Sequence, residues 1–427
     1  MADAGVALRN WAGNVVYTPT SLAEPTSVAQ LQSLVAASPR IRALGTRHSF
    51  STVADAPGVL VSLALLPREV DVEPASSTVR VSAATRWGEL APLLHEAGYA
   101  AHTLGSLPHI SVAGSVATGT HGSGDRNGSL ASAVAALELV GADGSLRRIS
   151  RGDKGFDGSV VALGTLGIVT HVTLEVQPTY EVEQTVYDDL PWTVLQSELD
   201  AVMASASSVS VFTRWLGAVA EQVWVKRRTN EPAPDLGWTG ARVADGPRHP
   251  VPGADPSSCT EQGSVAGPWF QRAPHFKVDV TPSSGDELQT EYLVAREHAV
   301  AALDAVHRIR ELVAPVLQIS ELRTVAADQL WLSPAYQRDS LAIHFTWISD
   351  ASAVLPVVEA VESALTPFAP RPHWGKVFAV PPATVASRYP RLGEMAALVT
   401  EHDPDRVFSN DMSDRHVRFP TASSRQT

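Results

Sequence analysis

The sequence predicts an α+β fold with two domains, and three observations support this prediction. The chain has 427 residues, which is more than one ordinary hydrophobic core accommodates. Up to about residue 178, short strand-like runs alternate with helical runs, and glycine-rich loops separate them. From about residue 179, the strand-like runs are longer and alternate polar with apolar residues, which is typical of an antiparallel sheet.

Local patterns predict the helices and strands of the first domain. Helical periodicity covers residues 27–37 and 87–97, with Thr26 as the expected N-cap of the first helix and Gly98 as the residue that ends the second. The expected strands cover residues 41–45, 58–66, 78–82, 135–140, 146–149 and 164–176. An Asp-Gly pair within residues 142–145 predicts a hairpin turn, because these residues tolerate the positive φ angles of such turns.

The second domain is predicted to be a mostly antiparallel sheet with helices between its later strands. The expected strands cover residues 180–186, 209–215, 222–226, 275–280, 288–293, 319–325 and 341–347, and the expected helices cover 296–312 and 351–368. Residues 230–274 are rich in proline and glycine, and they predict an excursion over the sheet because they are too many for a simple turn. Residues 401–419 show no strong period, and 421–427 are expected to be a disordered tail.

Composition and charge exclude several classes of function. The chain is 44% hydrophobic and 18% charged, which is typical of a soluble globular protein. Its net charge of −12 argues against a nucleic-acid partner. The single cysteine, Cys259, excludes an internal disulfide and fits a reducing compartment. The N-terminus shows no signal-peptide pattern, and apolar runs such as residues 58–66 are too short to span a bilayer, so we expect a cytoplasmic protein without a membrane partner.

Two glycine-rich loops of the first domain are the strongest functional signal. Residues 105–124 consist almost wholly of small residues, and residues 42–51 carry His48 in a polar turn. Such loops let the backbone approach a flat, phosphorylated ligand and leave N–H groups free to donate. The two loops together predict a dinucleotide held along its length. The alternative for His48 is a turn histidine without a role.

A second candidate site lies on the polar face of two strands in the second domain. Period-2 alternation places Glu321 and Arg323 on one face of a strand, and His344 and Thr346 on one face of the next. Lys376 follows within a basic and aromatic cluster. This set offers groups that bind hydroxyls and stabilise charge, and its spacing does not predict a metal site. The alternative is a solvated strand face with a half-buried histidine.

Sharper motifs of other enzyme classes are missing from the sequence. Residues 122–128 have the wrong spacing for Gly-x-Gly-x-x-Gly, and there is neither a Walker A loop nor a Gly-x-Ser-x-Gly elbow. The pair His95-Glu96 is followed by Tyr99 where a zinc helix needs a second histidine. These absences argue against a nicotinamide Rossmann enzyme, an NTPase, a zinc protease and an α/β hydrolase.

Both loops and several other segments resemble the vanillyl-alcohol oxidase family of flavoproteins, and within it the oxidases that act on alditols such as xylitol and sorbitol. The resemblance runs through nearly the whole chain, and its most specific segments are Trp11-Ala-Gly-Asn14, Gly45-Thr-Arg-His-Ser-Phe50, Ser106-Leu-Pro-His-Ile-Ser-Val-Ala-Gly114, Thr324-Val-Ala-Ala-Asp328, Trp331-Leu-Ser-Pro-Ala-Tyr336 and His373-Trp-Gly-Lys-Val-Phe378. It implies a monomer with an FAD-binding domain over residues 1–178, an antiparallel-sheet cap domain over 179–375, and a segment over 376–427 that returns to the FAD-binding domain.

The resemblance also implies how FAD is held. His48 stands where the family bonds a histidine covalently to the 8-methyl group of the flavin. The other implied FAD contacts are Ala43, Leu44, Gly45, Thr46, Arg47, Ser49, Gly105, Ser106, Ser111, Gly114, Ser115, Val116, Ala117, Thr118, His121, Gly122, Val169 and His373. Arg47 replaces a glycine of some relatives, which affects the expected loop conformation rather than the linkage. Gly105 is small enough to leave dioxygen a path to the ring.

The activity that the resemblance implies is oxidation of the terminal primary alcohol of an alditol to an aldose, with hydride transfer to flavin N5 and reduction of O₂ to H₂O₂. Ser106, Glu321, Arg323, Thr346 and Lys376 are expected to bind the polyol, with His344 beside them. Arg323 and Lys376 are expected to stabilise the developing alkoxide. Crowding by Arg323 is expected to lower the pKa of Lys376, so that its neutral form accepts the proton. An aldonolactone oxidase or dehydrogenase of the same family and a non-catalytic flavin- or sugar-binding protein remain open as alternatives.

Overall fold

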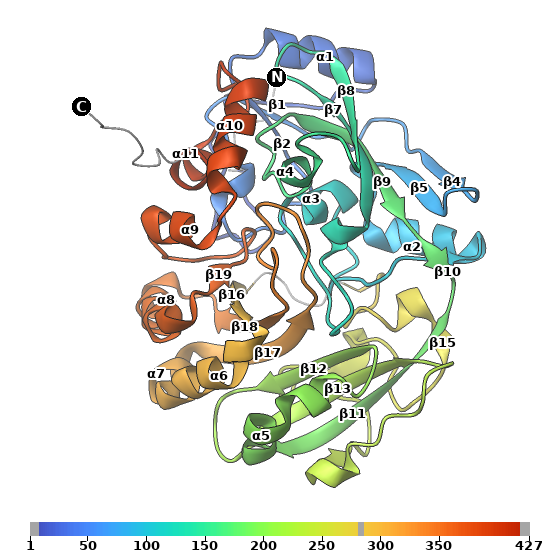
Figure 1. Cartoon of the computed structure of the whole chain (residues 1–427), viewed down its shortest axis with the longest axis vertical. Coiled ribbons are helices and arrows are strands. Elements are labelled where there is room, and N and C mark those ends of the chain that lie inside the picture. The colour runs from blue at the N-terminus through green and yellow to red at the C-terminus, as the bar shows by residue number, and fades with distance from the viewer. Residues whose placement is uncertain (1–7, 281–285, 419–427) are drawn as a thin grey trace.

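The computed structural model describes residues 8–280 and 286–418. Figure 1 shows one part of the molecule built on the N-terminal strands and another part built on a large sheet, with the C-terminal helices returning to the first part. The tail expected at residues 421–427 lies outside the described residues.

Small sheets form the first part of the molecule. A parallel sheet has the strand order β1 (Ser21–Ala23), β3 (Val59–Val61) and β2 (Ile41–Ala43). An antiparallel sheet has the order β4 (Val70–Glu73), β5 (Thr78–Ser82), β9 (Ile168–Glu175), β7 (Val134–Val140) and β8 (Leu146–Ser150). The short strands β6 (Tyr99–Ala100) and β10 (Gln177–Pro178) pair with each other.

Short helices connect these strands. They are α1 (Val28–Ala37), α2 (Trp87–Glu96), α3 (Val112–Ala117) and α4 (Phe156–Val160), with 3₁₀ turns η1 (Thr52–Ala54) and η2 (Leu130–Ala133). The N-cap of α1 is Ser27, whose hydroxyl accepts from the N–H of Gln30 at 3.2 Å, so the prediction of Thr26 was wrong by one residue. Gly98 follows α2 with a φ of +85°, as predicted.

The second part is built on a large sheet whose strand pairs are all antiparallel in the described chain, as predicted. Its strand order is β14 (Arg242–Val243), β11 (Glu181–Pro191), β13 (Val219–Arg228), β12 (Ser208–Thr213), β17 (Leu317–Val325), β18 (Ser340–Ile348), β16 (Glu287–Ala295) and β19 (Arg371–Pro372), while β15 (Gly267–Pro268) pairs with β11.

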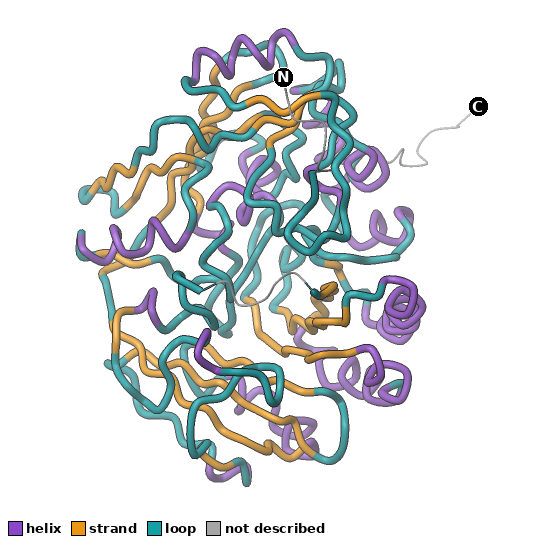
Figure 2. The backbone as a smooth tube through the Cα atoms, turned by 180° about the vertical axis from the view of Figure 1, so that it is seen from behind, coloured by secondary structure: helices purple, strands orange, loops and turns teal. Residues whose placement is uncertain are grey.

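Helices cover one face of this sheet and share a hydrophobic core with it. They are α5 (Trp192–Met203), α6 (Ala299–Arg308), α7 (Arg310–Val313) and α8 (Ala351–Leu365), with 3₁₀ turns η6 (Arg296–His298), η7 (Ala314–Val316) and η8 (Thr366–Phe368). Figure 2 shows these helices at the outside of the molecule. Among the described residues, the run Ala351–Phe368 is long and apolar enough to cross a membrane, but the core helix of a soluble protein meets the same criterion, and this run packs one apolar face against the sheet.

The excursion predicted for residues 230–274 contacts both faces of the sheet: Leu236 and Ala241 join the core on the helix-covered face, and later residues lie against the opposite face. It contains the 3₁₀ turns η3 (Gly237–Thr239), η4 (Pro256–Ser258) and η5 (Trp269–Gln271). Its buried Cys259 packs with Phe212 and Trp224 of the sheet. The strand predicted at residues 275–280 is wrong, because His275 and Phe276 donate their N–H groups to the carbonyl oxygen of Ser106 in the first part of the molecule.

The C-terminal helices pack on the first part of the molecule. They are α9 (Pro382–Arg388), α10 (Leu392–His402) and α11 (Asp411–His416). Their apolar residues, such as Met395 and Val399, share one core with Leu90 of α2 and Val160 of α4. Figure 1 shows α9, α10 and α11 beside the N-terminal strands. The sheets of the two parts therefore face each other across a space that loops from both parts line.

Candidate active site

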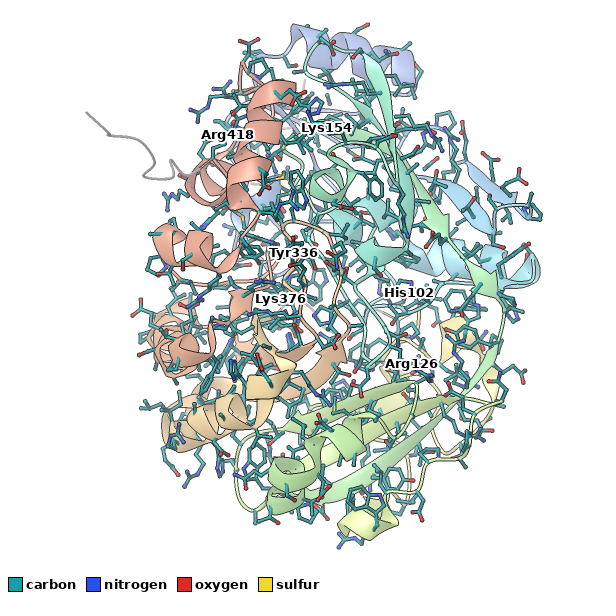
Figure 3. The ribbon with its side chains drawn as sticks, in the orientation of Figure 1. His102, Arg126, Lys154, Tyr336, Lys376 and Arg418 are labelled. Carbon is teal, nitrogen blue, oxygen red and sulfur yellow. The ribbon has the colours of Figure 1, made fainter. Side chains whose placement is uncertain are left out.

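A cavity of about 1030 Å³ runs between the two parts of the molecule. One end is lined by strand β2, by the residues that follow β3 and by both glycine-rich loops, and the other end by the polar faces of β16, β17 and β18. Figure 3 places Lys376 near the middle of the molecule, between these two sets of strands. The cavity thus joins the two candidate sites that the sequence predicted separately.

The first loop is anchored at both ends. The N–H of Leu44 donates to the carbonyl of Val61 at 2.8 Å, and the N–H of Phe50 donates to the carbonyl of Gly375 at 2.7 Å. Between these anchors, Arg47 has a φ of +63°, a left-handed conformation that costs an L-residue about 1–2 kcal/mol relative to glycine. The N–H of Trp11 donates to the carbonyl of Arg47 at 2.8 Å and holds this conformation. Arg47 therefore takes up, without glycine, a backbone region that glycine adopts readily.

His48 is presented to the cavity by this loop. The indole of Trp11 stacks on its imidazole, with ring centroids 5.6 Å apart. Its Nδ1 is buried, and it has no hydrogen-bond partner in the part of the chain that the structure describes. Burial lowers the pKa of His48 to about 4, so the imidazole is neutral at pH 7 and keeps a free nitrogen lone pair.

The second loop meets the first around Ser111. A Cβ added at Gly114 would lie 2.8 Å from the hydroxyl oxygen of Ser111, and one added at Gly45 would lie 3.2 Å from the same oxygen. A side chain at either position would therefore displace the hydroxyl of Ser111. Ser115, one turn further along α3, is fixed by the indole N–H of Trp87 at 2.9 Å.

Most of the residues predicted to hold FAD line the cavity. They are Ala43, Leu44, Gly45, Thr46, Arg47, His48, Ser49, Gly105, Ser106, Ser111, Gly114, Ser115, Ala117, Thr118, His121, Val169 and His373. Val116 and Gly122 are not in its wall: Val116 is buried in the hydrophobic core, and Gly122 lines a separate small cavity. The individual roles of all these residues stay predictions.

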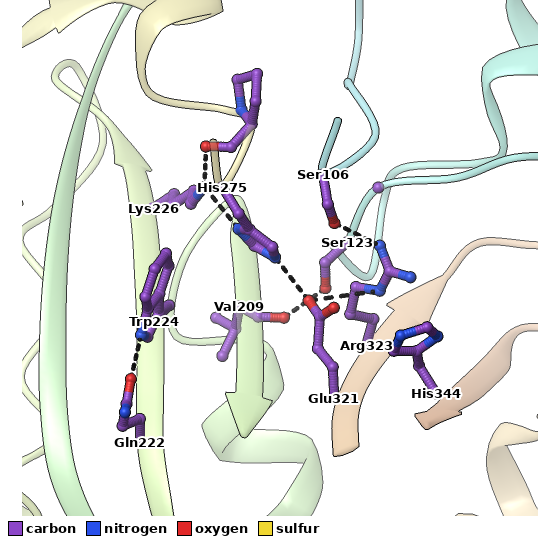
Figure 4. A network of polar contacts seen from close by, with 12 residues as sticks. Ser106, Ser123, Val209, Gln222, Trp224, Lys226, His275, Glu321, Arg323 and His344 are labelled. Atoms are coloured by element: carbon purple, nitrogen blue, oxygen red, sulfur yellow. Dashed lines mark hydrogen bonds and ion pairs between the residues drawn. The ribbon is translucent and has the colours of Figure 1, made fainter. Parts of the chain in front are cut away.

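The polar face of the large sheet is buried. Glu321 of β17 lies directly opposite His344 of β18 in the antiparallel register. Glu321, Arg323, His344 and Thr346 are each at most 8% exposed, which is inconsistent with the alternative of a solvated strand face. Figure 4 shows the side chains of Glu321, Arg323 and His344 converging from the two strands.

Glu291 is a central member of this site that the sequence analysis missed. One carboxylate oxygen accepts from Arg323 Nη2 at 2.8 Å, and the other accepts from Lys376 Nζ at 2.7 Å. His121 Nε2, from the second glycine-rich loop, lies 3.3 Å from the first of these oxygens. The signal was available, because Gln289 and Glu291 alternate with apolar neighbours along β16.

Lys376 lines the cavity among charged and polar groups, and its side chain is 14% exposed. Its Nζ lies 2.7 Å from Nδ1 of His344 as well as 2.7 Å from Glu291. Burial is the main cause that lowers its pKa, and Arg323 lowers it further, while Glu291 raises it. The predicted direction is thus confirmed, but desolvation rather than crowding by Arg323 is the larger cause. Nε2 of His344 lies 3.0 Å from the hydroxyl of Thr346, which orients the imidazole.

Glu321 is held as a carboxylate. His275 Nε2 lies 2.7 Å from its Oε1, and Arg323 Nε lies 3.5 Å from the same oxygen. Burial acts to raise the pKa of Glu321, but Arg323 and His275 outweigh it and hold the pKa well below its usual range. His275 was also missed as a site residue, because its place depends on the contact of an irregular segment with Ser106.

Comparison with known proteins gives the family. Residues 19–150 match the family described as FAD binding domain, and residues 281–416 match the family described as D-arabinono-1,4-lactone oxidase. Alditol oxidase from Streptomyces sp. (strain IKD472 / FERM P-14339) is 50% identical over 407 residues, which are 95% of this chain and 97% of that protein. This chain belongs to the alditol oxidase family. It is an FAD-dependent oxidoreductase.

Other relatives are more distant. L-gulono-1,4-lactone dehydrogenase from Mycobacterium tuberculosis (strain CDC 1551 / Oshkosh) is 29% identical over 425 residues, covering 95% of this chain and 98% of that protein. The solved structure of cholesterol oxidase from B. sterolicum has a TM-score of 0.76 at 14% identity and covers 96% of each chain. A chitooligosaccharide oxidase has a TM-score of 0.73 at 13% identity, over 95% of this chain and 93% of its own. These structures show the predicted fold, a vanillyl-alcohol oxidase-type FAD-binding domain with a cap domain.

The residues of the cavity fit FAD. The volume is at the upper end of the range of about 300–1,000 Å³ typical of ligand pockets, as a long dinucleotide requires. Gly45 and Gly114 form a cradle that side chains would fill, and the polar face of the sheet stands at the other end. His48, whose buried Nδ1 has no hydrogen-bond partner in the described chain, lines this same space.

Proposed function

We propose that this protein oxidises the terminal primary alcohol of alditols, of the xylitol and sorbitol type, to the aldose and reduces O₂ to H₂O₂. The observation that carries the proposal is the buried set of two cations, Arg323 and Lys376, and two carboxylates, Glu291 and Glu321, at the end of an FAD-sized cavity. The 50% identity to an alditol oxidase supports the same substrate class.

Bound FAD supplies the hydride acceptor and passes the electrons on to dioxygen. The residues of this chain bind the alcohol and take its proton. The oxygen of the reacting alcohol acquires negative charge as its proton leaves, and this charge is used to form the carbonyl as the hydride leaves the carbon. Fixed cations in a water-poor site stabilise such charge strongly. Arg323 Nη1 lies 3.4 Å from the Ser106 hydroxyl, so this cation stands next to the loop that the resemblance places beside flavin and substrate.

Lys376 is proposed to accept the alcohol proton at Nζ. Burial lowers its pKa and so favours the neutral amine that accepts a proton, and the neighbouring Glu291 carboxylate stabilises the ammonium that results. His344, whose pKa burial holds well below its usual value, stays neutral and keeps Nζ in place.

Glu321 is proposed to accept hydrogen bonds from the hydroxyls next to the reacting carbon. An alcohol that lacks these hydroxyls leaves a buried carboxylate without partners, which a site of this kind rejects strongly. Polyols are therefore favoured over simple alcohols. A non-catalytic binding protein would have no need of a paired lysine and arginine at this point.

The proposed linkage of His48 to the flavin 8-methyl group rests on the family resemblance and on the state of this imidazole. The ring is neutral, its Nδ1 has no partner in the described chain, and Trp11 holds its plane. A neutral imidazole with a nitrogen free to bond is what a carbon–nitrogen bond to the cofactor requires.

The testing experiment is the visible spectrum of purified protein before and after acid precipitation, followed by peroxide assays. A yellow pellet and peroxide from xylitol or sorbitol are expected. Peroxide from aldonolactones alone would favour the second candidate, an aldonolactone oxidase, which the match of residues 281–416 supports. Absence of flavin from the protein would overturn both.

For the His48→Ala variant, we expect any bound flavin to leave the protein on acid precipitation, because the proposed bond has no nitrogen to form it. The measurement is the flavin absorbance of pellet and supernatant. His95, which is distant from the cavity wall, provides the control, since His95→Ala is expected to keep the yellow pellet. Flavin that still precipitates with His48→Ala would remove His48 from this role.

A further inference from the structure

Two buried residues behind the proposed polyol site have no part in the chemistry described above. Lys226, on β13, is 2% exposed, and His275, on the segment that crosses the sheet, is 6% exposed. Neither family match covers them, because the matches end at residue 150 and begin again at residue 281. Lys226 is not among the residues of the large cavity wall, whereas His275 and Glu321 both line it.

These residues form a linear chain of contacts that ends on Glu321. Lys226 Nζ donates to the carbonyls of Ala273 and Pro274 at 2.8 Å each and lies 3.1 Å from Nδ1 of His275. The opposite nitrogen, Nε2, lies 2.7 Å from Glu321 Oε1. Figure 4 shows Lys226, His275 and Glu321 in this order, with Arg323 beyond them.

The chain of contacts fixes the tautomer of His275. An ammonium has three donors and no acceptor, and two backbone carbonyls occupy two of the donors. Burial lowers the pKa of Lys226 to about 7, so the ammonium predominates below that pH. Its third donor then points at Nδ1, which must accept, so that the proton of the neutral imidazole sits on Nε2 and is donated to Glu321. Burial lowers the pKa of His275 to about 4, which keeps the ring neutral.

We propose that Lys226 and His275 are positioning residues that orient Glu321 as a hydrogen-bond acceptor and thereby set the preference for substrates with a hydroxyl at C2. This inference rests on the proposed function. Lys226 polarises the imidazole, and the imidazole holds one oxygen of the carboxylate. The other oxygen is left to accept from the substrate. The groups that face Glu321 are His275 from the crossing segment, Arg323 from its own strand, and His344 from β18.

The experiment compares 1,2-pentanediol with 1-pentanol in the flavin-loaded enzyme, because these probes differ by the C2 hydroxyl alone. Xylitol oxidation by the unsubstituted enzyme is measured first. In Lys226→Met and His275→Phe, we expect the ratio of kcat/KM for diol over monoalcohol to fall about 10- to 100-fold, as a hydrogen bond to a charged group predicts. His275→Gln keeps an N–H near Nε2 and is expected to retain more of the ratio than His275→Phe.

A second readout is the pH profile of kcat/KM for xylitol. Since His275 and Lys226 favour the ionised form of Glu321, both variants should move to higher pH the acid limb that Glu321 controls, which lies below the rising limb of Lys376. Equal losses for diol and monoalcohol with an unmoved acid limb would mean that the two residues only support the fold, and would overturn the inference.

Failure of the unsubstituted enzyme to produce peroxide from xylitol would instead overturn the proposed function, and this inference with it. Flavin content of each variant checks folding, and Lys226→Met tests the chain of contacts even where His275→Phe fails to fold.

Discussion

Glu291 compensates two buried cations at once, and this fixes the reactivity of Lys376. Its side chain is 1% exposed, and Arg323 and Lys376 each contact one of its oxygens. Burial disfavours the carboxylate, but Lys376, Arg323 and His121 outweigh it and hold the pKa of Glu291 well below its usual range. The same ion pair raises the pKa of Lys376 against the effect of burial. Burial therefore lowers the pKa of the proposed base, and the Glu291 carboxylate raises it.

Replacing Lys376 by alanine tests the proposed base directly. We expect the rate of flavin reduction by xylitol, measured anaerobically by stopped flow, to fall about 10²- to 10⁴-fold, the range for loss of a general base or of charge stabilisation. Lys154→Ala, at an exposed position, is the control and should not change the rate. An unchanged rate in Lys376→Ala would exclude Lys376 from the reaction.

The Glu291→Gln variant should change both stability and pH dependence. Two buried cations lose their shared partner, so we expect the free energy of unfolding to fall by about 3–5 kcal/mol, as for a buried ion pair that loses one member. The pKa of Lys376 falls further, so the rising limb of its pH–rate profile should move to lower pH. Denaturant titration and kcat/KM from pH 5 to 9 measure the two effects.

The matched control for this variant is Glu359→Gln, the same chemical change on the exposed face of α8. The free energy of unfolding should change there by no more than about 0.5 kcal/mol, and the pH profile should shift by no more than the corresponding amount. A pH profile of Glu291→Gln that coincides with that of the unsubstituted enzyme would show that Glu291 does not control the proton affinity of Lys376.

At the scale of elements, alternation predicted those site residues whose strands have one polar face. Strands β17 and β18 pair without a register shift from Ile319 to Val325, and cross-strand pairing of Glu321 with His344 follows from this register. The same rule applied to β16 would have identified Glu291, since the strand pairs with β18 and places Glu291 opposite His344. The residues of this part of the site can therefore be identified from the alternation of polar and apolar residues along each strand.

Other elements were not predictable because distant contacts define them. His275 lies where it does because its N–H binds the carbonyl of Ser106, in another part of the chain. Helix α11 has six residues, too few to show a period, and its N-cap Asn410 donates to the carbonyls of Thr52 and Asp55. Arg47 takes a left-handed conformation without glycine because Trp11 binds its carbonyl. In each case the partner is separated in sequence by tens or hundreds of residues.

At the scale of the whole molecule, the site is assembled from segments that begin at residue 11 and end at residue 376. The loop bearing His48 is tied to the segment bearing Lys376 by the bond from Phe50 to Gly375. The hydroxyl of Ser51 adds a second bond, to the carbonyl of Trp374 at 2.7 Å. The proposed cofactor attachment and the proposed base therefore move together, and the cap sheet contributes the remaining polar groups.

Assembling the site in this way buries several histidines, and this predicts how stability depends on pH. Burial lowers the pKa of His275 and His416 to about 4 and that of His373 to about 3, so the native state keeps them neutral while the unfolded chain protonates them near pH 6.5. The unfolded state then binds more protons, and the free energy of unfolding should fall as pH drops from about 6.5 to 4.

Urea titrations of the flavin-loaded protein between pH 7.5 and 4.5 measure this slope. His416→Gln, outside the cavity wall, should flatten it, whereas the same change at the exposed His298 should not. A stability that stays constant from pH 6.5 to 4.5 would show that these imidazoles are protonated in the native state.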